Sequence, residues 1–415
     1  MGAEFRNETF EVIEGELASY DGGGADSFSG NTPQNSGKFN RYNFGGYFSL
    51  DYDVSDAFLL SGTIRAENYS DFGALATYKT SARYKVTNNF NFRGSFSTGY
   101  RAPSLQQKYF SNTLTSFSQG GLVQSRVANN NDPITRLAGI PALKQETSNN
   151  MSLGFSWKPM QGLSVTVDGY KIKMKDRVVL SGLFSAGDAT LPTALTDKLN
   201  SLGVATAQFF ANAVNTTNTG VDIVVDYQKK LSATEKLKFL LVGNLQGIDI
   251  DAINVPDALN TNEYNANTFF NDREKFFLKA SAPASKFSFT ADYTKKKVSI
   301  GARVTYFGKL TLTGFGYNGD GIDPMVPTDA DENVFVPEHF NYGGKFTTDI
   351  YSNIQLSKKV SFIFGADNIF NVHPDFAVNP QAKYWAGDNE TGGPWDGVQM
   401  GYNGLRLFTK LAFKF

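Results

Sequence analysis

Residues 76–101 read ATYKTSARYKVTNNFNFRGSFSTGYR, and this stretch decides the fold. Apolar and polar side chains alternate from Ala76 to Val86, stop at the polar turn 87–89, and alternate again from Phe90 to Arg101. Successive side chains of a β-strand point to opposite faces of the sheet. The stretch therefore predicts a β-hairpin with aromatic side chains on one face and hydrogen-bonding or charged side chains on the other.

Similar alternation recurs along most of the chain. The clearest further runs lie at 42–52, 58–66, 221–227, 237–245, 298–306 and 360–366. Together the runs predict about fourteen strands of roughly 10–14 residues, long enough to cross an apolar membrane layer when tilted. Strands of soluble sheets are shorter, commonly about 5–6 residues. We therefore predict an all-β protein, a transmembrane antiparallel β-barrel of the outer membrane of a Gram-negative bacterium.

One predicted strand changes the phase of its alternation. The apolar positions of the run 163–177 are first Leu163, Val165 and Val167, and then Tyr170, Ile172 and Met174. A β-bulge near 168–169 would shift the phase by one residue. A strand that leaves the membrane and no longer faces lipid would lose the phase in the same way, so both interpretations stand.

The connections alternate in length. Short ones are predicted at 54–56, 87–89, 159–162, 229–234, 295–296 and 357–358. Long ones are predicted at 15–38, 102–145, 177–216, 250–283, 311–344 and 371–402, with a shorter one of the same group at 68–74. Short periplasmic turns and long extracellular loops are the arrangement of outer-membrane barrels. No internal repeat or linker divides residues 1–415, so we predict one domain.

Composition excludes several classes of protein. The formal net charge of −1 does not suit a nucleic-acid binder, which needs a basic surface. The chain has no cysteine, and no run of about 18 apolar residues that would form a spanning helix. Residues 1–6 do not resemble a signal peptide. Since an outer-membrane protein must be exported, we expect either that the signal was removed or that the chain begins within a longer one.

The C-terminal run resembles the signal by which outer-membrane barrels are recognised for assembly. Leu407, Leu411, Phe413 and Phe415 share one face, and the sequence ends on the last of these rings. We assign this role to Phe413 and Phe415.

Five stretches in a consistent order resemble motifs of one family. They are RGSFSTGYRAPSL at 93–105, LKQETS at 143–148, the strand from Val167 to Arg177, TGVD at 219–222 and DNIFN at 367–371. Each is weak alone, but together they cover nearly the whole chain and resemble the C-terminal barrel portion of TonB-dependent receptors.

The resemblance implies parts that this sequence does not contain. Such receptors have a twenty-two-stranded barrel, an N-terminal plug and a segment that contacts TonB. We therefore expect residues 1–415 to be the last fourteen strands, with the plug and first strands absent. A second polypeptide could supply them. An open sheet in lipid would leave two unpaired edges.

The implied function is active uptake of a scarce solute such as a siderophore, cobalamin, an oligosaccharide or a peptide. The implied partners are this solute, outer-membrane lipid and the TonB complex, reached through the plug; no nucleic acid is expected. The alternative is a closed fourteen-stranded barrel that acts as a passive porin-like or fatty-acid-channel-like pore. A third possibility is an orphan fragment that transports nothing.

Two groups of residues are candidates for function. Basic residues on the polar face are predicted to face the lumen, where they would attract an anionic solute or pair with carboxylates of a plug: Lys79, Arg83, Lys85, Arg93 and Arg101. Residues of two long loops are predicted to bind the solute, although their rings would equally anchor one loop on another: Arg101, Gln106, Gln107, Tyr109, Phe110, Phe209, Phe210 and Asn212.

No catalytic or metal site is predicted. The acidic stretch 329–333 lacks the spacing of a calcium loop, and the only two histidines lie in different loops. Neither histidine has a serine and acid partner nearby in the sequence. We therefore expect no cofactor, no bound metal and no enzymatic activity.

Overall fold

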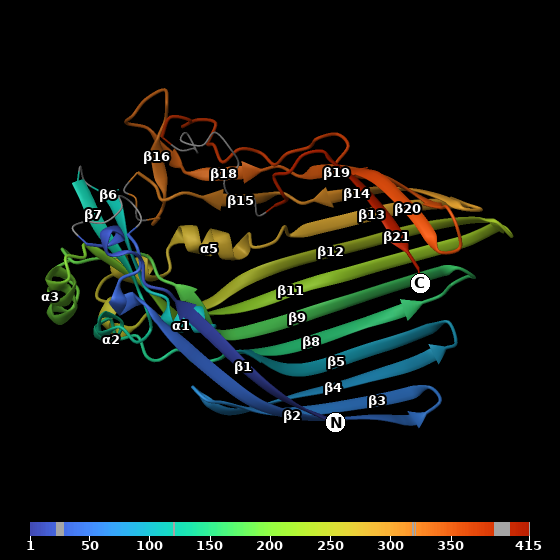
Figure 1. The fold of residues 1–415 in the computed structure, drawn as a ribbon, viewed down its shortest axis with the longest axis horizontal. Coiled ribbons are helices and arrows are strands. Elements are labelled where there is room, and N and C mark those ends of the chain that lie inside the picture. The colour runs from blue at the N-terminus through green and yellow to red at the C-terminus, as the bar shows by residue number, and fades with distance from the viewer. Residues whose placement is uncertain (22–28, 119–120, 318, 320, 386–398, 415) are drawn as a thin grey trace.

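The computed structural model describes residues 1–21, 29–118, 121–317, 319, 321–385 and 399–414. One antiparallel ladder organises them (Figure 1). Neighbours in the ladder follow the order β1 (Gly2–Val12), β2 (Gly37–Ser55), β3 (Phe58–Tyr69), β4 (Gly73–Thr87), β5 (Phe90–Arg101), β8 (Glu146–Trp157), β9 (Leu163–Leu180), β11 (Thr206–Ser232), β12 (Glu235–Ile253), β13 (Ser285–Lys295), β14 (Val298–Phe307), β19 (Lys345–Gln355), β20 (Val360–Asp367) and β21 (Arg406–Phe413).

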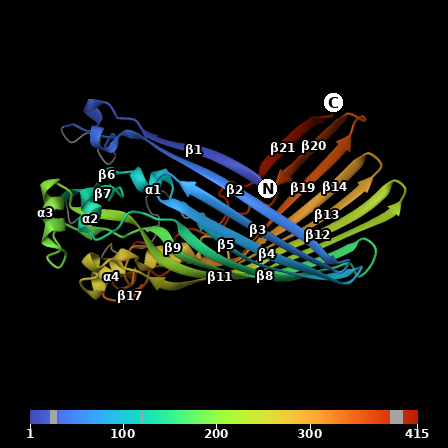
Figure 2. The ribbon, with the colours of Figure 1, turned by 90° about the horizontal axis from the view of Figure 1, so that it is seen from below.

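The predicted fold class is confirmed, and so is the alternation of connections. Each predicted short turn overlaps a turn of the structure; for example, β4 ends at Thr87 and β5 begins at Phe90. The predicted turn 229–234 is too long, because β11 continues to Ser232. The short turns lie together at the right end of the strands, and α1, α2 and α3 lie at the left end (Figure 1). The sheet curls, so that β1 and β21 run along the same side of the molecule (Figure 2).

Register shows which side chains share a face. Phe48 lies opposite Ile64, which in turn lies opposite Tyr78, so one row of apolar side chains crosses three strands. These side chains are exposed, and we call their side the outer face. On the other side, Arg83 lies opposite Arg93, and ion pairs and loop residues gather there. We call it the inner face. An exposed apolar face beside a polar one is typical of a membrane-spanning β-wall.

The long loops build small elements of their own. They contain the helices α1 (Leu105–Tyr109), α2 (Pro133–Leu137), α3 (Thr193–Ser201), α4 (Glu263–Phe269) and α5 (Asp272–Lys279), the 3-10 turns η1 (Leu17–Ser19), η2 (Pro33–Asn35) and η3 (Asp257–Leu259), and the short strands β6 (Asn112–Ser118), β7 (Gly121–Ala128), β10 (Phe184–Ser185), β15 (Leu310–Thr313), β16 (Met325–Pro327), β17 (Phe335–Pro337) and β18 (His339–Tyr342). None of the helices in the described residues is long and apolar enough to span a bilayer.

Two buried clusters hold the loops on the strands. The larger includes Phe184, Leu195, Phe209 and Leu259, which join the loop after β9, the start of β11 and the loop after β12. The smaller includes Leu312 and Tyr342 in the loop between β14 and β19. Burial of such side chains is worth roughly 1.5–3 kcal/mol each. Packed apolar clusters therefore stabilise loops that the sequence shows only as irregular.

Two sequence predictions about the strands were wrong. The predicted loop 177–216 is too long, because β9 continues to Leu180 and β11 begins at Thr206. The predicted β-bulge near 168–169 does not exist, since the register of β9 with β8 and β11 is continuous there. The register shifts lie instead at 212–216 of β11. The phase change in β9 thus marks a change of environment, since the strand is regular at 168–169 and its irregularity lies further on, at Asp176, where φ is +57°.

Candidate functional site

The strand that carries the signature 93–105 separates from its neighbour near its end. The β4–β5 ladder stops at Lys79 opposite Ser97, although β4 continues to Gly73 and β5 to Arg101. The hydroxyl of Thr98 still accepts the N–H of Tyr78 at 3.0 Å. Beyond this point the hydroxyl of Tyr100 donates to Glu67 of β3 and lies 3.3 Å from the hydroxyl of Tyr69.

Arg101 is held by the wall itself. Its guanidinium donates to both carboxylate oxygens of Glu146, with Nε 3.0 Å from Oε2. Glu146 is only 3% exposed and also accepts the N–H of Val178 at 2.8 Å. A bidentate pair of this kind fixes geometry as well as charge. Arg101, predicted to bind solute, therefore has a partner that joins β5, β8 and β9.

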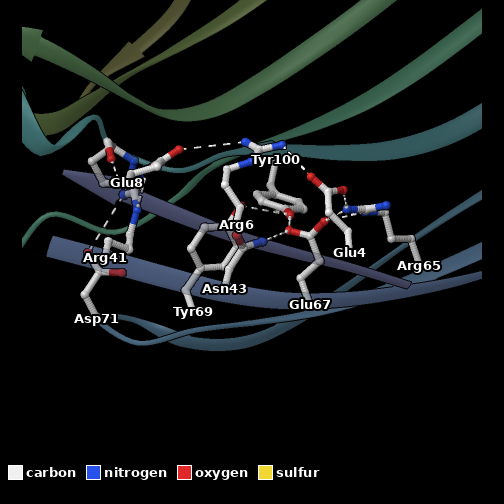
Figure 3. A network of polar contacts seen from close by, with 11 residues as sticks. Glu4, Arg6, Glu8, Arg41, Asn43, Arg65, Glu67, Tyr69, Asp71 and Tyr100 are labelled. Atoms are coloured by element: carbon white, nitrogen blue, oxygen red, sulfur yellow. Dashed lines mark hydrogen bonds and ion pairs between the residues drawn. The ribbon is translucent and has the colours of Figure 1, made fainter. Parts of the chain in front are cut away.

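A network of charged side chains lines the inner face of β1, β2 and β3 (Figure 3). Arg41 is at its centre, with a side chain only 5% exposed. Its Nε donates to Glu8 at 2.9 Å, its Nη1 donates to the carbonyl of Pro103 at 2.6 Å, and the same Nη1 lies 3.9 Å from Asp71. Asp71 in turn accepts from Lys108 of α1 at 2.5 Å.

The network continues toward the short-turn end of the wall. Arg6 pairs with Glu4 at 2.9 Å, and Arg65 pairs with Glu4 at 2.7 Å and with Glu67. The whole network balances four carboxylates against four cations: Glu4, Glu8, Glu67 and Asp71 against Arg6, Arg41, Arg65 and Lys108. It therefore ties the segment 100–108 to three strands without leaving excess charge on this part of the inner face.

Local sequence explains the short helix α1. Ser104 caps it by accepting the N–H of Gln107 at 3.0 Å, and the side chain of Gln107 accepts the N–H of Ser104 at 3.0 Å. This reciprocal capping box satisfies two backbone donors that the helix leaves open. At the other end, Tyr109 stacks on Phe39 with ring centroids 4.1 Å apart and planes at 7°. Gln106 lies within α1, and Phe110 is the residue directly after the helix.

A cavity of about 480 Å³ opens beside this ring stack. Its wall combines the rings of Phe39 and Tyr109 with amides and charged groups from the loops. Arg126 and Asp132 pair there at 2.7 Å, and Lys198 comes from α3. Small-molecule sites commonly have volumes of about 300–1,000 Å³ and combine apolar walls with a few polar groups. This is the candidate solute site.

The second group of predicted solute-binding residues lies elsewhere. Phe209, Phe210 and Asn212 belong to strand β11, although the sequence placed them in a loop. Phe209 is fully buried in the larger cluster. The amide of Asn212 accepts the N–H of Lys144 and donates to the carbonyls of Lys144 and Asp176 at 2.7–2.9 Å. These side chains hold β11 to its neighbours and are not part of the cavity.

Four of the predicted lumen residues share the inner face. Lys79 lies opposite Ser97, Arg83 opposite Arg93, and Lys85 opposite Asn91, so all four basic side chains point the same way. The Nε of Arg93 donates to Asp168 at 2.7 Å. From the sequence, Arg93 was predicted to attract an anionic solute or to pair with a carboxylate of a plug. Its partner in this structure is a carboxylate two strands away in the same wall.

The predicted assembly signal lies at the end of β21. Phe413 is the last residue of β21 and is 60% exposed on the outer face. Phe415 lies outside the described residues. Within the described residues, no group of three or more histidine and acidic side chains is arranged to hold a metal ion.

Several important residues were not found from sequence. Arg41, Asp71 and Lys108 pair across large sequence separations, and no spacing rule joins them. The alternation of Glu4, Arg6 and Glu8 was the one available signal, since these three charges share a face of β1.

One buried acid outside the wall has a raised pKa. Glu338, beside β18, is 8% exposed, and its carboxylate accepts the N–H of Gly316 at 2.6 Å. Burial raises the pKa of Glu338 above its ordinary value of 4.5, and the hydrogen bond from Gly316 only partly opposes this effect. The group therefore titrates closer to neutral pH than an exposed glutamate.

Comparisons with known proteins agree on one architecture. The family described as "TonB dependent receptor-like, beta-barrel" matches residues 1–369. The heme/hemopexin utilization protein C of Haemophilus influenzae is 26% identical over 261 residues, which are 60% of this chain and 31% of that protein.

Two solved structures are similar to the whole chain. A variant of the ferric enterobactin receptor of Pseudomonas aeruginosa superposes with a TM-score of 0.62 at 17% identity, over 100% of this chain and 50% of that one. A siderophore receptor of Acinetobacter baumannii gives a TM-score of 0.58 at 13% identity, over 100% and 51%. At such identities the likeness concerns the fold. The chain spans about half the length of these receptors.

Proposed function

This chain belongs to the TonB-dependent receptor β-barrel family, and from that premise we propose that it forms part of an outer-membrane receptor for energised uptake of an iron chelate. The solute binds at the loop end of the wall. Force transmitted through TonB to a plug then opens a path along the inner face. The plug belongs to the proposed complete receptor and to no residue described above.

The cavity beside Tyr109 is the observation that carries the proposal. Two stacked rings, Phe39 and Tyr109, provide a flat aromatic surface, and Lys198 supplies a positive charge beside the ion pair of Arg126 with Asp132. Aromatic faces and cations together favour a flat, anionic solute. Haem is a flat ring with two carboxylates, and a ferric catecholate is an anionic complex that exposes flat aromatic rings; the names of the relatives mention haem and enterobactin. We therefore favour this class over oligosaccharides, peptides and cobalamin.

We also propose that the chain is the C-terminal part of a longer wall. Within the described residues, β1 pairs only with β2 and β21 only with β20. Unpaired strand edges in lipid are costly, because each unsatisfied backbone group costs several kcal/mol. Further strands, from the same polypeptide or a second one, would cover both edges. The alternative, a closed passive pore, requires β1 to pair with β21.

Uptake measurements test the proposal. The complete receptor is expressed in a strain that lacks its own haem and siderophore receptors, and uptake of haem and of a ferric catecholate is followed with and without TonB. We expect uptake of one solute that stops when TonB is deleted. Uptake that continues at the same rate without TonB would instead support the passive pore, and binding without any uptake would refute the transport function.

The site is tested by Tyr109→Ala. Loss of the stacked ring should weaken solute binding by about tenfold, since aromatic pairs contribute about 0.5–1.5 kcal/mol beyond the area that they bury. Phe376→Ala is a matched control, because Phe376 is an exposed loop ring outside the cavity. Equal affinities for the two variants would remove the cavity from the proposal and leave the family assignment intact.

A further inference from the structure

The phase change in β9 lies outside the cavity beside Tyr109, and it coincides with a charged patch on the outer face. Register places Leu153, Gly169, Val221 and Leu245 in one row across β8, β9, β11 and β12. Leu153 is 70% exposed and Leu245 44%. On β9, β11 and β12 this row is the last apolar one on the outer face before the loop end, whereas on β8 the exposed Met151 lies one row further, opposite Lys171.

On β9, β11 and β12 the next rows toward the loops are polar on the same face. Lys171 lies opposite Thr219, and Lys173 lies opposite Thr217, which in turn lies opposite Asp249. Lys175 continues the series on β9. All three lysines are exposed. The outer face thus changes from apolar to charged within one row, which marks the upper border of the hydrocarbon layer.

At the same height along the strands, the inner face changes from polar to apolar. Tyr170 shares the inner face with Asp168 and Arg93, and its hydroxyl accepts a hydrogen bond from Asn244 at 3.2 Å. On β12, Ile250 packs against the larger buried cluster of the loops. Two strands therefore invert their polarity together: apolar residues turn inward to hold the loops, and charged residues turn outward to the surroundings of the wall.

These outward residues line a cavity of about 480 Å³. Lys171, Lys173 and Lys175 form one side, and Asp249 and Asp251 form the other. The hydroxyl of Thr217 donates to Asp251 at 2.7 Å. Among the ion pairs of the described residues, none includes any of the three lysines. Three cations without an ion-pair partner at a membrane border suit an anionic lipid headgroup.

We propose that this cavity binds the phosphorylated sugar headgroup of an outer-leaflet glycolipid. The lysines contact phosphate groups, and the two aspartates accept hydrogen bonds from sugar hydroxyls. Three lysines favour a glycolipid that carries two phosphate groups over a simple phospholipid that carries one. The cavity adjoins the apolar row at Leu153, so the acyl chains of the same lipid lie along that row. This proposal depends on the membrane orientation of the wall and not on solute uptake.

The test measures binding of lipid A, the phosphorylated glucosamine glycolipid of Gram-negative outer leaflets. The complete receptor in detergent is titrated with diphosphoryl, monophosphoryl and dephosphorylated lipid A of identical acylation, and bound lipid is counted by native mass spectrometry. We expect the diphosphoryl form to bind most tightly. A triple variant, K171Q/K173Q/K175Q, should lose on the order of a hundredfold, at roughly fivefold for each lysine near an anionic lipid surface.

The control variant is K229Q/K230Q/K297Q, which removes three exposed lysines at the short-turn end. It should bind as the unsubstituted protein does. Heat-dependent mobility on gels shows that each variant is folded.

Three results would overturn the proposal. They are equal binding of dephosphorylated lipid A, equal loss in both triple variants, and displacement of the lipid by millimolar inorganic phosphate, which would indicate a site for the free anion. Because the assay needs neither TonB nor solute, its outcome is independent of the uptake experiment.

Discussion

Arg41 should be the most sensitive position in the inner-face network. Arg41→Gln removes the donors to Glu8 and to the carbonyl of Pro103, and leaves Asp71 with one cation fewer. Removing one partner of a buried ion pair costs about 3–5 kcal/mol. Glu8 is about one-third exposed (34%) and can regain water, so we expect about 2–3 kcal/mol here.

Two readouts test this expectation. Denaturant unfolding from lipid vesicles, followed by tryptophan fluorescence, gives the change in stability. Hydrogen exchange of the α1 amides gives the local effect, which should be roughly thirtyfold faster exchange for a loss of about 2 kcal/mol. Arg6→Gln is the matched control, because Arg6 also contacts Glu8 but is 52% exposed, and exposed pairs contribute about 0–1 kcal/mol. Equal effects of the two substitutions, with unchanged exchange in α1, would refute the central role of Arg41.

Three further predictions concern the faces, the loops and the turns. Leu153→Arg, on the outer face, should cost about 1 kcal/mol in vesicle unfolding, because it places a cation near the border of the apolar layer, where the cost is well below its value at the bilayer midplane. Glu338 has a raised pKa, so its contribution to loop stability is full below pH 4.5 and is lost as the pH rises through the raised value. Hydrogen exchange at β15 and β18 should therefore speed up from pH 4 to 7.5 after correction for intrinsic rates, and Glu338→Gln should flatten that change. Gly162→Ala should cost about 1–3 kcal/mol in the same vesicle unfolding, since φ is +84° there and the new Cβ would lie 2.1 Å from the carbonyl oxygen of Gln228. An unchanged midpoint for either wall variant, or parallel pH profiles for Glu338 and its glutamine variant, would contradict these expectations.

The strands and turns could be predicted because their signals are local. Alternation from Phe90 to Arg101 reports two faces directly, and a polar turn such as 87–89 separates two such runs. The same logic failed at Phe209 and Asn212. Their part of β11 packs among the loops, and its buried face carries three alanines beside Phe209 instead of the large apolar side chains that mark a membrane wall.

The site was only partly predictable, because its contacts are distant in sequence. Tyr109 was singled out as a loop ring, but its partner Phe39 lies in a strand 70 residues earlier, and nothing local links them. The charges of Arg93 and Arg101 were visible, whereas their carboxylate partners in the same wall, Asp168 and Glu146, depend on strand order. Sequence thus indicates which residues face inward but not which of them remain free for a ligand.

We expect one face of this wall to meet lipid and the other to meet water. The chain has no cysteine, so single spin labels can be introduced at Leu153→Cys on the outer face and at Ser95→Cys on the inner face. Collision rates in vesicles, measured by electron paramagnetic resonance with lipid-soluble oxygen and a water-soluble nickel chelate, report the two environments. We predict that collisions with oxygen dominate at position 153 and collisions with the nickel chelate at position 95. The reverse pattern, or the same environment at both positions, would contradict it.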